Sequence, residues 1–220
     1  MTRLRISRRL GLPSVALAAI GLVASSSASA EGAKATYTFG TFDARTTITF
    51  VSEADLETIH GVSHKVSGQL VVDPATSAAT GKLTVPVKDM HTGIDVRDGH
   101  MRGENGGVWL EAAKYPDISF ELVKTSRVAG TKDRVDYEGK LSIHGVTKDW
   151  KGSAMVRFIP ASVAGPAKLG DGDWLRVKAE FDVPIQDFGI VIPDGVGPKV
   201  SATWHVTIDV YGTTAPPAPK

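Results

Sequence analysis

A period-two alternation of apolar and polar residues dominates the chain from residue 44 onward. In its clearest run, Trp204, Val206 and Ile208 alternate with His205 and Thr207. Successive side chains of a strand point to opposite faces, so such a run predicts a strand with one apolar face. Eight runs of this kind are present, at residues 44–50, 66–72, 81–87, 118–123, 135–143, 150–158, 175–183 and 200–210.

Turn-forming residues separate these runs. Asp73-Pro74, Gly170 to Asp173 and Asp194-Gly195 each follow or precede a predicted strand. His144-Gly145 is short enough to join the fifth and sixth runs as a hairpin. Only residues 96–114 have helical character, and because glycines at 103, 106 and 107 interrupt them, we expect two short helices and a loop.

Eight short strands with one apolar face each form either a two-sheet sandwich or a closed barrel. Small residues recur on the apolar faces, where a solid core favours larger side chains: Gly68, Gly81, Gly139, Gly152, Ala154, Ala179 and Ala202. They indicate either the tight bends of a barrel or an internal void. Periodicity alone leaves both open.

The first thirty residues have the composition of a secretory signal peptide. Four arginines precede an apolar run from Leu10 to Ala24, and small residues lead to Ala30, where we expect cleavage. The run is too short for a membrane span, which needs about 20 apolar residues. We therefore expect an exported, periplasmic protein without a transmembrane segment in its mature form; the choice between general secretory and twin-arginine export stays open.

Removal of the signal leaves 190 residues, 21 of them basic and 24 acidic, for a net charge of −3. This surface offers no electrostatic reason to bind nucleic acid. The chain lacks cysteine, which excludes thiolate nucleophiles and cysteine-ligated metals. We expect one domain over residues 31–211 and a disordered, proline-rich tail over residues 212–220.

Polar clusters offer little catalytic chemistry. His60 and His64 have a metal-like spacing, but Gly61 argues against the helix that would bring them together, so solvated side chains are the favoured interpretation. His144 lies in a tight turn, where bonding to the backbone is usual. No Gly-x-Ser-x-Gly motif is present. We expect no enzyme activity and no cofactor.

The cluster of Arg97, Asp98 and His100 permits two interpretations. As a binding group, it would orient a ligand head group at the mouth of a barrel, because arginine offers forked donors and histidine a tunable one. As a structural group, Asp98 would cap a short helix and pair with Arg97. The structural interpretation is favoured.

Five ordered motifs resemble the YceI-like family of lipid- and polyisoprenoid-binding periplasmic proteins. They are Val66-Ser-Gly-Gln-Leu-Val-Val-Asp-Pro74, Thr92-Gly-Ile-Asp-Val-Arg-Asp-Gly-His-Met101, Lys114-Tyr-Pro-Asp-Ile-Ser-Phe120, Gly139-Lys-Leu-Ser-Ile-His-Gly-Val-Thr-Lys148 and Asp187-Phe-Gly-Ile190. The resemblance runs from about Tyr37 to Tyr211. It implies an all-β, eight-stranded, antiparallel lipocalin-like barrel with one or two short helices near one opening, and an elongated apolar cavity.

The same resemblance implies a long-chain isoprenoid or acyl lipid as partner. We expect the large side chains of the apolar faces, together with Arg97, Asp98 and His100, to contact it: Ile48, Phe50, Leu70, Leu83, Phe120, Leu141, Trp150, Phe181 and Trp204. Burial of about ten methylenes yields a favourable free energy of roughly 8 kcal/mol. Association itself costs about 4–15 kcal/mol, which offsets that gain. Long tails are therefore favoured over short ones.

Two other functions stay open at this stage. The first is a periplasmic enzyme or metal-binding protein that uses the polar cluster at the barrel mouth. The second is an interaction module with a filled barrel, which would display a large exposed apolar patch. A homodimer stays open as the oligomeric state.

Overall fold

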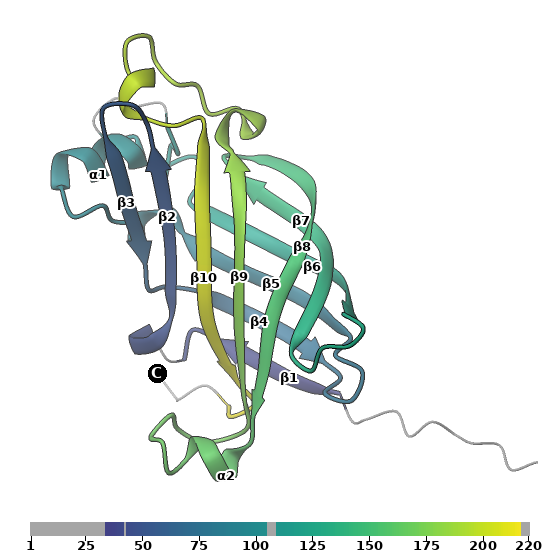
Figure 1. Cartoon of the computed structure of the whole chain (residues 1–220). Coiled ribbons are helices and arrows are strands. Elements are labelled where there is room, and N and C mark those ends of the chain that lie inside the picture. Colours follow the sequence, from purple (N-terminus) through teal and green to yellow (C-terminus); the bar gives the residue numbers. More distant parts are fainter. Residues whose placement is uncertain (1–33, 42, 105–108, 217–220) are drawn as a thin grey trace, which may run out of the picture. The chain divides into compact units, whose positions relative to one another are not determined.

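Ten antiparallel strands build the domain in the computed structural model, which describes residues 34–41, 43–104 and 109–216 (Figure 1). The expected signal peptide, residues 1–30, lies outside the described residues. The strands are β1 (Ala35–Phe39), β2 (Thr47–Glu53), β3 (Thr58–Ser63), β4 (Ser67–Val72), β5 (Ala79–Pro86), β6 (Asp117–Arg127), β7 (Arg134–Ile143), β8 (Val146–Ile159), β9 (Trp174–Pro184) and β10 (Thr203–Thr213).

Short helices connect some of the strands. There are two α-helices, α1 (Asp95–Arg102) and α2 (Ala161–Ala164), and four 3₁₀ turns, η1 (Asp43–Arg45), η2 (Val87–Asp89), η3 (Ile185–Phe188) and η4 (Gly197–Lys199). Helix α1 lies beside the β2–β3 hairpin, and α2 lies at the far end of β8 and β9 (Figure 1).

The sheet closes into an eight-stranded ring. Neighbours follow the order β1-β4-β5-β6-β7-β8-β9-β10, and β10 returns to β1 through the pairs Thr38–Thr213 and Phe39–Gly212. The β2–β3 hairpin adds to the earlier part of β10, where Trp204 to Asp209 pair with Thr47 to Ser52. The barrel predicted from the sequence is confirmed, and the sandwich is excluded.

The eight predicted strands correspond to β2 and β4 to β10, whereas β1 and β3 were not predicted. Strand β1 buries only Tyr37 and Phe39, too short a pattern to stand out as an alternation. The buried positions of β3 are Ile59, Gly61 and Ser63, of which only the first is large and apolar. Pairing with longer neighbours determines both strands.

Two boundary predictions were wrong. Residues 109–114 form bends and turns where a second short helix was expected, while residues 105–108 lie outside the described part. The expected tail from residue 212 begins too early, because β10 continues to Thr213. The Thr213 hydroxyl is buried and donates to the Asp171 carbonyl at 2.8 Å, which holds this end of the strand.

The small residues on the inner faces serve different purposes. Gly68 and Gly81 have φ angles of +131° and +145°, and a Cβ on either would lie within 2.1 Å of a carbonyl oxygen of the neighbouring strand. These two allow β4 and β5 to bend closely together. Gly139 and Gly152 lie beneath aromatic rings of adjacent strands, those of Phe120 and Tyr137, and Gly139 also approaches a carbonyl oxygen of β6.

The hairpin predicted at His144-Gly145 is confirmed: β7 ends at Ile143, β8 begins at Val146, and both turn residues have positive φ. Gly145 has a φ of +76°, and a Cβ there would lie 2.4 Å from Cε1 of Tyr115. The turn is therefore packed against the segment that precedes β6.

Gly145→Ala should lower the free energy of unfolding by about 2–4 kcal/mol, because left-handed strain adds to overpacking against Tyr115. Gly130→Ala is the matched control, since Gly130 has a φ of +77° with no atom within 4 Å of its Cβ position. It should cost about 1 kcal/mol. Urea denaturation of both variants measures the difference, and equal losses would contradict the assigned Tyr115 contact.

Candidate lipid-binding cavity

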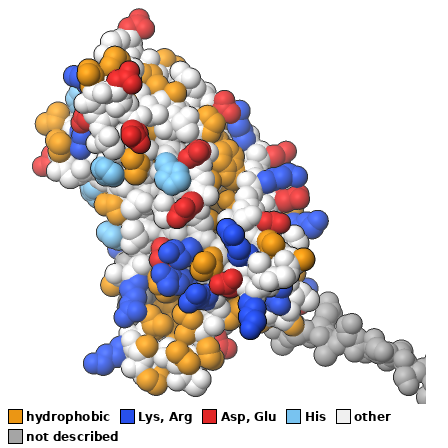
Figure 2. Space-filling model, viewed as in Figure 1, with side chains coloured by type: hydrophobic (Ala, Val, Ile, Leu, Met, Phe, Trp, Pro, Cys, Tyr) orange, Lys and Arg blue, Asp and Glu red, His pale blue; other side chains and the backbone are white. Residues whose placement is uncertain are grey.

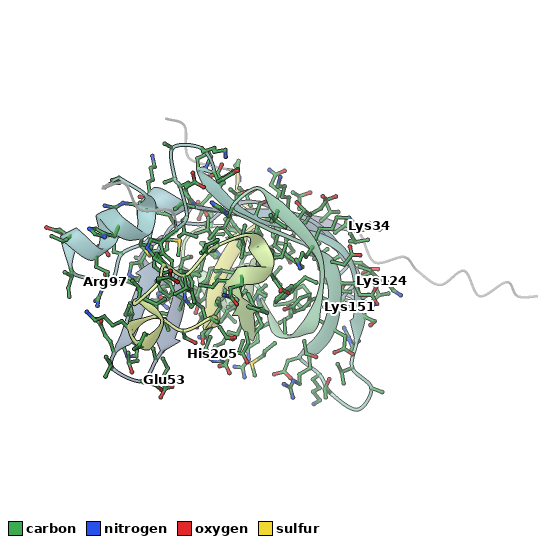
Figure 3. The ribbon with its side chains drawn as sticks, turned by 90° about the horizontal axis from the view of Figure 1, so that it is seen from above. Lys34, Glu53, Arg97, Lys124, Lys151 and His205 are labelled. Carbon is green, nitrogen blue, oxygen red and sulfur yellow. The ribbon has the colours of Figure 1, made fainter. Side chains whose placement is uncertain are left out.

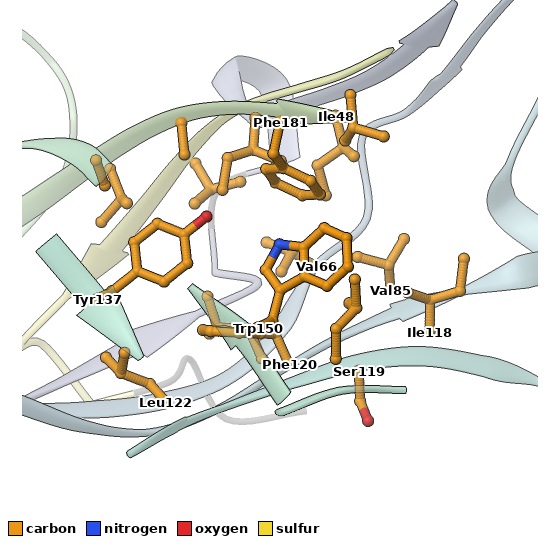
Figure 4. A pocket seen from close by; sticks show the side chains of 18 of the residues that line it. Ile48, Val66, Val85, Ile118, Ser119, Phe120, Leu122, Tyr137, Trp150 and Phe181 are labelled. Atoms are coloured by element: carbon orange, nitrogen blue, oxygen red, sulfur yellow. The ribbon is translucent and has the colours of Figure 1, made fainter. Parts of the chain in front are cut away.

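The barrel encloses an apolar cavity of about 220 Å³ (Figure 4). Its wall is drawn from β2 to β10, with Met90, Leu110, Ile185 and Ile190 at one end. All nine apolar residues predicted as ligand contacts line it: Ile48, Phe50, Leu70, Leu83, Phe120, Leu141, Trp150, Phe181 and Trp204. The sequence pattern therefore identified the inner face correctly; contact with a ligand stays a prediction.

The alternation that predicted the strands also separates the cavity from a charged exterior. On β7, Tyr137 and Leu141 are buried, whereas the intervening Glu138 and Lys140 are exposed. Those outward side chains form ion pairs with β8, from Lys140 to Asp149 at 3.1 Å and from Lys151 to Glu138 at 3.5 Å. Figure 3, a view from above, places Lys124 and Lys151 on this outer surface.

The wall of the cavity is nearly devoid of polar groups. Among the described residues, no charged side chain lines it. Its polar groups are two indole nitrogens and the hydroxyls of Thr49, Ser63, Ser77, Ser119, Thr125 and Tyr137. Burial raises the pKa of Tyr137, so its hydroxyl stays protonated at neutral pH. The cavity thus suits an uncharged, mainly apolar molecule.

One end of the barrel is closed by tight packing. Val87, Leu110, Ile185, Phe188 and Ile190 are each at most 2 % exposed and fill the space under η2 and η3. His144 anchors this region, because its ring nitrogens lie 2.6 Å from Glu111 Oε2 and 3.3 Å from the Phe188 carbonyl. The backbone bonding expected for His144 is confirmed.

A second pocket, here called the outer pocket, lies beside this closed end. Its volume is about 450 Å³, and its wall comes from β2, β3, α1, the neighbourhood of η4 and Trp109. It is more polar than the barrel cavity, since Glu57, Arg97, His100 and Lys199 contribute to it.

Phe50 and Trp204 belong to the walls of both pockets. Their rings are stacked, with centroids 4.6 Å apart and planes 17° apart. Gly61 makes room for this arrangement, because a Cβ there would lie 2.0 Å from the Phe50 ring. The stacked pair is therefore the partition between the barrel cavity and the outer pocket.

Arg97 faces the outer pocket and is tied to the β2–β3 hairpin. Its Nη1 donates to Glu57 Oε1 at 2.6 Å, and its Nε donates to the Thr92 hydroxyl at 2.9 Å. Arg97 and Glu57 are partly exposed, so the pair positions α1 more than it stabilises the fold.

Asp98 points away from both pockets. It is 3 % exposed, and its Oδ1 accepts from the backbone nitrogen and hydroxyl of Thr92 at 2.7 and 2.5 Å. Burial is the largest single influence and acts to raise the pKa of Asp98, but the hydrogen bonds from Thr92 and nearby positive charges together hold that pKa below its ordinary value. Asp98 stays ionised and fixes the loop that leads into α1.

The three residues of the predicted polar cluster therefore do not converge. His100 also lines the outer pocket and is exposed, but no hydrogen bond or ion pair of the described residues joins the Asp98 side chain to it or to that of Arg97. The structural interpretation was wrong in detail: α1 is preceded by Ile94 at its N-cap without a side-chain cap, and Arg97 pairs with Glu57. The partner of Arg97 lies forty residues away, which short-range reasoning could not find.

The contacts of the remaining described histidines do not indicate a metal site. His64 Nδ1 lies 2.7 Å from the Thr46 carbonyl oxygen. Over the described ranges, no group of three or more potential metal-ligating side chains gathers. No helix of the described chain is long and apolar enough to cross a membrane.

The outer pocket was missed by sequence reasoning. Glu57, Trp109 and Lys199 come from three segments that are far apart along the chain and have no shared periodicity. The sequence offered two signals. Arg97 and His100, predicted at a barrel mouth, do line this pocket, and the small residue Gly61 opposite Phe50 became informative once β2 and β3 were known to pair.

Solved structures share this fold at low sequence identity. Burkholderia cenocepacia BcnA superposes with a TM-score of 0.63 at 18 % identity, covering 78 % of this chain and 99 % of BcnA. The YceI protein of Campylobacter jejuni gives 0.60 at 19 % identity, covering 73 % and 88 %. A polyisoprenoid-binding domain from Saccharophagus degradans, implicated in plant cell wall breakdown, gives 0.57 at 19 %, covering 83 % and 99 %.

The match to a family model covers most of the chain. No curated protein matches the chain. The YceI-like domain, however, matches residues 37–211, from the middle of β1 to near the end of β10, and so includes every strand of the closed ring. With the barrel and its apolar cavity, this match shows that the chain belongs to the YceI-like family.

Proposed function

We propose that this protein is an exported carrier that binds a long-chain isoprenoid or related amphiphilic lipid in its barrel cavity without catalysing a reaction. The observation that carries the proposal is the continuous apolar wall, to which nine strands contribute and no charged residue does, within the described chain. A polyisoprenoid-binding domain of the same fold supports the choice of ligand class. The signal-like residues 1–30 support export to the periplasm.

The size of the cavity also favours a ligand that stabilises the fold. An apolar void of 220 Å³ costs about 5 kcal/mol at roughly 24 cal/mol per Å³. A hydrocarbon chain inside the barrel restores those contacts. Because this volume is below the approximately 300–1,000 Å³ of common ligand sites, we infer that the ligand also extends past Phe50 and Trp204 into the outer pocket.

The polar residues favour positioning over catalysis. Asp98 accepts hydrogen bonds from Thr92, and Arg97 is paired with Glu57, so neither is poised as an acid or base. His100 and Lys199 line the outer pocket and are exposed there. We assign to them the head-group end of the ligand, with the tail in the barrel.

The protein purified from its own cell envelope should carry one long-chain lipid, seen by native mass spectrometry and identified after solvent extraction. Val177→Trp places a large ring in the cavity and should lower the bound fraction at least about tenfold, a loss equivalent to about 1.4 kcal/mol. Glu180→Trp, on the outer face of the same strand, is the matched control and should retain the lipid. Full lipid occupancy in Val177→Trp would exclude the barrel cavity as the site.

Phe50→Leu should accelerate both uptake and release of a fluorescent long-chain lipid roughly 2- to 12-fold, because loss of a stacked ring removes about 0.5–1.5 kcal/mol from the partition. Stopped-flow fluorescence measures the two rates. Phe39→Leu is the control, since Phe39 also packs over a glycine, Gly212, but lines neither pocket. Equal acceleration in both variants would mean that the lipid does not pass the Phe50–Trp204 pair.

A further inference from the structure

Two indole N–H groups in the cavity wall have no hydrogen-bond partner. Trp150 Nε1 and Trp204 Nε1 are both buried, and no acceptor among the described residues lies within reach of either. Trp204 is only 8 % exposed. Buried donors are nearly always paired in folded proteins, so an unpaired donor in a ligand cavity calls for an explanation.

Both tryptophans pack in the apolar cluster at the closed end of the barrel. The ring of Trp150 is 5.9 Å from that of Phe181, and Phe181 pairs with Val206, two residues from Trp204. Both are thus at the end of the cavity nearer the outer pocket, whose wall Trp204 shares.

A third donor faces the same space. Figure 4 shows the Tyr137 hydroxyl and the Trp150 indole nitrogen projecting into one region of the pocket from adjacent strands. The Tyr137 hydroxyl has no hydrogen-bond partner in the described part of the chain, and Tyr137 stays protonated, because burial raises its pKa. It remains both a donor and an acceptor.

The neighbouring groups do not satisfy these donors well. The nearest rings to Trp150 are those of Phe181, at an interplanar angle of 72°, and Phe188. An N–H directed at an aromatic face is a weaker interaction than an N–H to an oxygen. An oxygen acceptor on the ligand is the partner that these donors lack.

We propose that the ligand of this cavity carries an uncharged oxygen acceptor, such as a carbonyl, near its head-group end, and that Trp150 donates a hydrogen bond to it with support from Tyr137 and Trp204. The inference deepens the proposed function and rests on it. An ionised group does not fit this position, because no described residue of opposite charge lines the barrel. The apolar tail then extends toward Leu70, Val72 and Ala79.

The test compares two synthetic ligands of equal length: a geranylgeranyl methyl ketone and the corresponding hydrocarbon without the oxygen. Both are titrated into the delipidated protein, and the ratio of their dissociation constants is measured for the wild type, Trp150→Phe and Trp174→Phe. The wild type should bind the ketone about tenfold more tightly. Trp150→Phe should abolish most of that preference, because the ratio of the two constants cancels any loss of apolar contact that both ligands share. Trp174→Phe, which lines neither pocket, should preserve the preference.

A second readout reports the hydrogen bond itself. The chain has four tryptophans, so ¹H–¹⁵N spectra give four indole signals that the Trp→Phe variants assign. The ketone, but not the hydrocarbon, should shift the Trp150 signal downfield. A preference that survives in Trp150→Phe, or an indole signal that responds equally to both ligands, overturns the inference while leaving the proposed carrier function intact. Failure of the wild type to bind either ligand overturns both.

Discussion

The pairing of β10 along both of its edges is the interaction on which the rest of the structure depends. One edge is hydrogen-bonded to β9 over eleven residue pairs. The other edge is shared, first by β2 and then, near Thr213, by β1, which closes the ring. Closure satisfies the backbone groups of both edges and forces every second side chain of each strand inward. The cavity and its apolar wall are consequences of that closure.

The division of one edge between two strands also creates the outer pocket. Because β2 occupies the earlier part of β10 and β3 follows β2, the outer edge of β3 has no further strand beside it in the described chain. Its one contact there is the isolated bridge between Val62 and His91. The chain from η2 to α1 covers this gap. It is held there by the hydrogen bonds from Thr92 to Asp98 and from Arg97 to Glu57. These polar residues thus maintain the wall of the outer pocket by holding α1 in place.

The sequence predicted those parts of the molecule that repeat with a period of two. Inward residues such as Leu141 and Phe181 were identified correctly because closure preserves the alternation of each strand. Contacts across the gap beside β3 obey no such period. The pairing of Arg97 with Glu57 depends on where the β2–β3 hairpin meets α1, and β3 itself was hidden because Gly61 and Ser63 occupy its inner face. Its apolar surface is supplied by the ring of Phe50 from the neighbouring strand.

The pairs in which an aromatic ring covers a glycine have a consequence for how such proteins diversify. Phe50 over Gly61, Phe120 over Gly139 and Tyr137 over Gly152 each place a ring on the backbone of the adjacent strand. The direction of every such ring, and with it the contour of the cavity, is determined by a residue that has no side chain. Exchange of Gly61 or Gly152 for alanine would therefore turn a ring and reshape the cavity while every lining side chain kept its identity. Comparisons of specificity between relatives need to align these glycines with the same care as the residues that contact the ligand.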